Sequence, residues 1–131
     1  MGAWGTGSFE NDEAKDWVAG LDKIVPEELT RILAQAVDVP GYMEAPAAYV
    51  AVAAAEVVAA LSGASAEGAP PGIVDWAEAR PQALTPELKA VAIRALERVR
   101  RNSEAKDLWM EADGLNDWIA AIQELQSRLG G

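Results

Sequence analysis

The stretch that decides the fold is Ala45–Leu61, which reads "APAAYVAVAAAEVVAAL". As a helix it is apolar on most of its sides, and such a helix fits a central position that other helices surround. The run is rich in weakly hydrophobic alanine and is interrupted by Glu56, so it fits a buried core helix better than a membrane span. We therefore predict a core helix over residues 44–62.

Apolar residues recur at helical spacing over most of the remaining chain, and no run shows the alternation of a strand. The predicted fold class is all-α: a single domain over residues 1–131, a bundle of about five to six helices around the central Ala/Val-rich helix. Besides the core helix, we expect helices over residues 11–22, 26–39, 73–79, 84–102 and 114–129.

Local signals mark where three of these helices begin. Asn11 or Asp12 suits the N-cap of the first helix, because a short polar side chain can accept a hydrogen bond from the free amides there. Thr85 suits the N-cap of the helix that opens with Pro86, and Pro26 suits the first position of the second helix. These three starts follow from local chemistry alone.

Two segments fall outside the helical pattern. Residues 1–10 contain three glycines, whose backbone freedom allows Trp4 and Phe9 to press onto neighbouring helices. We therefore expect a docked N-terminal segment. Residues 63–72 are rich in glycine and proline, which predicts a surface loop.

The composition limits the function. The formal net charge is −10, from 21 acidic and 11 basic residues, and the chain contains no cysteine and no histidine. Disulfides, thiolate metal sites, cysteine nucleophiles and histidine bases are thereby excluded. The negative charge repels nucleic acids and anionic membranes but attracts a basic protein, so we expect neither of the first two as a partner. No export signal opens the chain, so a cytoplasmic location is expected.

Paired carboxylates are the pattern that comes nearest to a metal site. Glu13 and Asp16 lie one helical turn apart, and so do Glu104 and Asp107. Acids on facing helices can hold magnesium, as in all-α nucleotide pyrophosphohydrolases. Solvated helix faces carry as many acids, however, and lysines interleave with these. We predict no metal, no cofactor and no catalytic residue, and keep the four acids as candidates that would have to converge.

Trp109 is the candidate for a partly exposed interaction anchor, although we favour a core position for most of the five tryptophans. It stands beside Glu104, Asp107 and Glu111, and tryptophan is enriched at binding hot spots. This group of residues predicts a surface that binds a partner.

A basic stripe lies on the helix predicted for residues 84–102. Arg94, Arg98 and Arg101 share one face at i, i+4 and i+7 spacing. They either pair with acidic helices of the same chain, which we favour, or bind an anionic partner. A nucleic acid is not expected, because no aromatic residues interleave with the arginines.

Glu56 is a lone acid inside the most apolar helix. If it is buried, it must pair with a cation or change its pKa, and Arg94 or Arg98 could serve as the cation. The alternative, which we favour, is a position at the helix margin where the carboxylate reaches water.

Three stretches of the chain resemble the bacterial family DUF4259, a domain of unknown function: "MGAWGTGSFENDEAKDWVAGL", "RNSEAKDLWMEA" and "WIAAIQELQSRL". Members of this family begin with a Gly-x-Trp-Gly segment and a Phe-x-Asn-Asp step that precede a helix. The resemblance implies a small helical cytoplasmic protein with no established activity, so it transfers no functional residue. The signature positions of this sequence are Gly2, Trp4, Gly5, Phe9, Asn11 and Asp12.

The leading hypothesis is a non-enzymatic protein-interaction factor, of the immunity or antitoxin kind, whose acidic surface neutralises a basic partner. One alternative is a magnesium-dependent hydrolase of a nucleotide or phosphoester that uses the four candidate acids. Another is a homo-oligomeric structural protein, held by apolar surface left over after the helices pack.

Overall fold

The computed structural model describes residues 5–130, which form seven α-helices, one short 3-10 helix and no strand. The predicted all-α class is therefore confirmed for the described part of the chain. The elements in chain order are α1 (Asp12–Ala19), η1 (Leu21–Lys23), α2 (Pro26–Asp38), α3 (Ala45–Leu61), α4 (Pro71–Glu78), α5 (Pro86–Arg101), α6 (Glu104–Glu111) and α7 (Leu115–Arg128).

The helix starts follow the local chemistry of the sequence. Asn11 Oδ1 accepts a hydrogen bond of 2.8 Å from the Ala14 amide, which makes Asn11 the N-cap of α1. Thr85 Oγ1 accepts one of 3.0 Å from the Leu88 amide at the start of α5. Pro26 opens α2, as expected.

Two differences from the predicted elements concern helix boundaries and number. The structure adds α6, an eight-residue helix that the set of predicted helices lacks. It also starts α4 at Pro71, so the predicted loop of residues 63–72 ends earlier than expected. A proline at the first position suits the new start, because its missing amide would have had no partner there.

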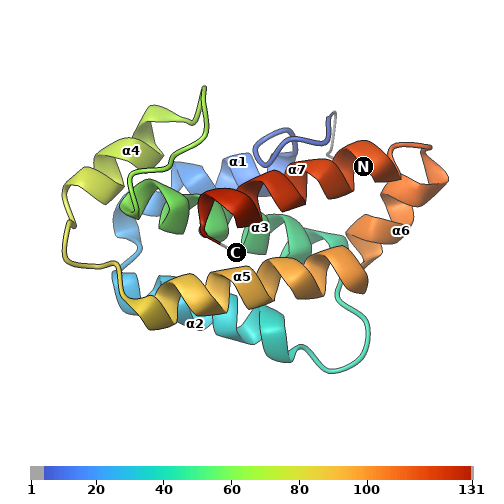
Figure 1. The fold of residues 1–131 in the computed structure, drawn as a ribbon, viewed down its shortest axis with the longest axis horizontal. Coiled ribbons are helices and arrows are strands. Elements are labelled where there is room, and N and C mark those ends of the chain that lie inside the picture. The colour runs from blue at the N-terminus through green and yellow to red at the C-terminus, as the bar shows by residue number, and fades with distance from the viewer. Residues whose placement is uncertain (1–4, 131) are drawn as a thin grey trace.

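Helix α3 packs against each of the other six α-helices. Its residues 51–59 are buried without exception, and all of them except Glu56 are alanine or valine. Small side chains let neighbouring helices approach closely, so this sequence suits a helix that is covered on many sides. Figure 1 shows α6 and α4 at opposite ends of the molecule.

The described part of the N-terminal segment, residues 5–10, lies against the helices. The Phe9 side chain packs on the core, and the Ser8 hydroxyl donates a hydrogen bond of 2.6 Å to Glu56 on α3. Gly2 and Trp4 lie outside the described residues. Among residues 5–130, no helix has the length and apolarity that a membrane crossing requires.

Candidate functional site

Helix α6 and the loop before α3 form an acidic surface with an exposed aromatic ring. We call it the α6 acidic surface, and it consists of Tyr42, Glu104, Asp107, Met110 and Glu111. Tyr42 and Met110 are 53% and 52% exposed, and Val25 is the only other exposed large apolar residue among residues 5–130. Asp107, Met110 and Glu111 share one face of α6, because they are three and four residues apart.

Hydrogen bonds between the loop and α6 hold this surface in place. The Glu104 amide donates to the Met43 carbonyl at 2.8 Å, and Glu104 Oε1 accepts from the Ala45 amide at 2.8 Å. The second bond caps α3, whose N-cap residue Glu44 makes no side-chain cap of its own. A carboxylate at this position also complements the positive end of the helix dipole.

Three carboxylates act on the Tyr42 side chain. The Tyr42 hydroxyl donates a hydrogen bond of 2.6 Å to Asp107 Oδ2. This bond raises the pKa of Tyr42 to about 12, with smaller contributions from desolvation and from the charges of Asp107, Glu104 and Glu111. The acids predicted as interaction residues therefore converge on a tyrosine that the sequence analysis did not single out.

Asp107→Asn is expected to lower the pKa of Tyr42 toward its ordinary value, because it removes the charged acceptor. The unfolded chain releases the phenolic proton near 10.0 and the folded chain near 12, so the free energy of unfolding falls as the pH rises through this window. Asp107→Asn should shrink that fall. A titration of tyrosinate absorbance measures the shift, and Tyr42→Phe identifies which tyrosine titrates. An unchanged titration in Asp107→Asn would contradict the assignment.

Trp109 is partly exposed, so its role as an interaction anchor stays a prediction. Its ring is partly buried against the core, and its indole nitrogen has no contact with solvent. A Cβ atom on Gly114 would come within 2.7 Å of the Trp109 ring, so the start of α7 packs directly on it. Tyr42 is the more exposed aromatic residue of this surface, because Trp109 lies on a different face of α6 from Asp107 and Glu111.

Glu56 and Arg128 form a buried ion pair, which corrects the expectation that Glu56 reaches water. Glu56 is 2% exposed, and Arg128 donates to both of its carboxylate oxygens at 2.9 Å. Arg128 also donates to the Ala64 carbonyl at 3.0 Å and to Glu124 at 2.7 Å. The cation is therefore neither Arg94 nor Arg98. The hydrogen bonds to Glu56 raise the pKa of Arg128, so its guanidinium stays charged.

The basic stripe serves the fold in two of its three positions. Arg98 donates to the carbonyls of Val39 at 2.8 Å and Gly41 at 2.7 Å, beyond the C-terminal end of α2. Arg101 pairs with Glu97 of the same helix at 3.2 Å. Arg94 is exposed and makes no hydrogen bond or ion pair with a described residue. Two of the three arginines therefore pair within the chain. Arg98 bonds backbone carbonyls and Arg101 bonds an acid of its own helix, so neither pairs with a separate acidic helix.

The four metal candidates do not gather at one point. Within residues 5–130, no three acidic side chains are placed to hold a metal ion together. Glu104 and Asp107 bond the loop before α3, as described above, while Asp16 is exposed on α1. Glu13 has one carboxylate oxygen that is buried and without a hydrogen-bond partner among the described residues.

A comparison with known protein families identifies the family of this chain. The family model described as "Domain of unknown function (DUF4259)" matches residues 2–121, which is most of the sequence. The chain belongs to this family. The comparisons with curated proteins and with solved structures each returned no match.

The structure describes four signature positions of this DUF4259 member, and most of them contribute to the packing or capping of the helices. Asn11 caps α1, Phe9 packs on the core, and Gly5 borders a small cavity. Asp12 is the exposed first residue of α1.

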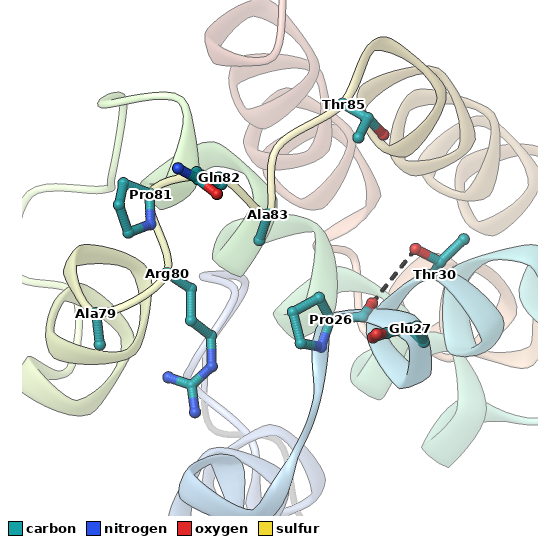
Figure 2. Close-up of a pocket in the computed structure, with 9 residues that line it drawn as sticks. All are labelled: Pro26, Glu27, Thr30, Ala79, Arg80, Pro81, Gln82, Ala83 and Thr85. Carbon is teal, nitrogen blue, oxygen red and sulfur yellow. Dashed lines mark hydrogen bonds between the residues drawn. The ribbon is translucent and has the colours of Figure 1, made fainter.

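A hollow of about 690 Å³ lies between the start of α2 and the linker from α4 to α5 (Figure 2). These segments lie at the end of the molecule opposite α6 (Figure 1). Its charged side chains are Arg80 and Glu27, whose charges offset each other. The Arg80 guanidinium lies over the Trp76 ring, 4.5 Å from its centre, and donates to the Trp76 carbonyl at 3.2 Å. These contacts account for the position of Arg80, and the lining has no net charge with which to select an ionic ligand.

Proposed function

We propose that this DUF4259 member is a non-enzymatic interaction factor of the cytoplasm, of the immunity or antitoxin kind. It binds a basic protein through the α6 acidic surface. The net charge of −10 supports this proposal, because it attracts cationic partners over a long range and speeds their association. The two alternatives, a magnesium-dependent hydrolase and a homo-oligomeric structural protein, stay predictions.

The observation that carries the proposal is the exposed Tyr42 ring among three carboxylates. Tyrosine and arginine are enriched among the residues that dominate binding energies. An arginine of the partner can stack on the Tyr42 ring while its guanidinium pairs with Asp107 or Glu111. The exposed Met110 adds adaptable apolar contact beside them.

Affinity capture from an extract of the source cells tests the proposal. At low salt, the wild-type chain is expected to retain a stoichiometric protein with a basic isoelectric point. Tyr42→Ala and Glu111→Lys are each expected to weaken retention by about tenfold or more, which corresponds to about 1.4 kcal/mol of binding free energy. Raising the salt concentration should weaken all complexes, because it screens exposed charges.

Glu78→Lys is the matched control for Glu111→Lys. It makes the same change in net charge on an exposed residue of α4, at the opposite end of the molecule (Figure 1). Glu78→Lys should retain the partner nearly as well as the wild type. If no basic protein is retained, or if both charge reversals weaken retention equally, the α6 acidic surface is not the binding site.

A further inference from the structure

A small cavity lies between residues 5–8 and helices α3, α6 and α7. Its walls include Tyr49 of α3, Trp109 of α6 and Trp118 of α7. The space open to the centre of a water molecule is about 10 Å³. One water fills about 10–15 Å³ of a cavity, so a space this small has room for a single small occupant.

Two polar atoms of the cavity walls lack hydrogen-bond partners among residues 5–130. They are the Tyr49 hydroxyl and the Trp109 indole nitrogen, both shielded from solvent, and Tyr49 as a whole is 5% exposed. Burial raises the pKa of Tyr49, and the nearby Trp109 N–H lowers it in part, but neither atom has a partner at the distance and angle of a hydrogen bond. An unpaired buried polar group destabilises the fold, because it has lost its hydrogen bonds to water, so both atoms need a partner.

The chemistry of these atoms defines the occupant. An indole N–H can only donate, so the occupant must accept a hydrogen bond, and a metal cation cannot do this. The Tyr49 hydroxyl can donate or accept. The charge of Glu13, whose buried Oε2 atom also lacks a partner among the described residues, acts on Tyr49 and favours an occupant that can donate as well. Water is the smallest molecule that both donates and accepts.

We infer that this cavity binds one water molecule, which accepts a hydrogen bond from Trp109 Nε1 and forms another with the Tyr49 hydroxyl. The water joins α3 to α6 on the side of α6 away from Asp107. It satisfies two buried polar atoms that the described part of the chain leaves without partners.

A crystal structure of the full chain, at a resolution that orders internal water, tests this inference. We expect one isolated density peak at about 2.7–3.2 Å from both Trp109 Nε1 and Tyr49 Oη. Tyr49→Phe should lose that peak, because it removes one of the two partners and internal waters need two to four. Tyr42→Phe is the matched control: it deletes the same hydroxyl at the surface and should keep the peak.

Three results would overturn the inference. They are a cavity without density although both side chains keep their positions, a direct hydrogen bond between Tyr49 and Trp109, and an undiminished peak in Tyr49→Phe. If Tyr49→Phe does not fold, Trp109→Phe replaces it, because it removes the other partner. The wild-type density alone already decides whether the cavity is hydrated.

Discussion

Arg128→Ala is expected to lower the free energy of unfolding by about 3–5 kcal/mol, because it leaves the Glu56 carboxylate buried without a cation. The side chains of Glu56 and Arg128 are 3% and 17% exposed, so water cannot replace the lost partner fully. Four segments of the chain meet at this pair. Ser8 bonds Glu56, and Arg128 bonds both the loop after α3 and Glu124 on its own helix.

Two controls separate burial from charge in this prediction. Arg101→Ala removes a surface arginine that pairs with Glu97 and is 72% exposed, and it should cost at most about 1 kcal/mol. The double replacement Glu56→Met with Arg128→Met should recover much of the loss, because no charge then stays buried. Chemical denaturation measures all three variants. If Arg128→Ala and Arg101→Ala cost the same, the buried pair does not stabilise the fold as described.

Arg98→Ala is expected to lower the free energy of unfolding by about 2–3 kcal/mol. Its guanidinium donates to the carbonyls of Val39 and Gly41 at 2.8 and 2.7 Å, and to that of Asn102 at 3.2 Å. These bonds hold the α2–α3 loop against α5. Hydrogen bonds from a charged donor are worth about 1.5–3 kcal/mol each, less where solvent can compensate.

Arg94→Ala is the matched control for Arg98→Ala. It lies one turn earlier on α5, is exposed, and bonds to no described residue. It should change the free energy of unfolding by no more than about 0.5 kcal/mol. Equal costs for the two arginines in thermal or chemical unfolding would contradict the role assigned to Arg98. Because the loop held by Arg98 carries Tyr42, Arg98→Ala should also weaken partner retention.

Local signals predict the longer helices of this chain well. Three helix starts depend only on contacts within one turn, so neighbouring residues are enough to predict them. They are the caps at Asn11 and Thr85 and the proline at the start of α2. Helix α6 is missing from the predicted set, although α1 and α4, which have the same length of eight residues, are in it. The signal that could have found it is Ser103, whose hydroxyl accepts from the Lys106 amide and caps the helix.

Contacts between distant segments explain what the sequence could not show. Glu56 and Arg128 are 72 positions apart, so helical spacing on α3 or α5 could not identify the partner. Tyr42 and Asp107 are 65 positions apart, and Tyr42 lies in a loop that has no periodic pattern. The sequence therefore predicts the acidic face of α6 but misses the aromatic ring that this face surrounds.

Hydrogen exchange of the wild-type chain, with and without its recovered basic partner, tests the proposed function most directly. Binding at the α6 acidic surface predicts slower exchange at residues 39–45 and 104–111, which contain the surface and the loop that supports it. Slower exchange confined to α4 and the linker before α5, with no change in α6, would contradict the proposal.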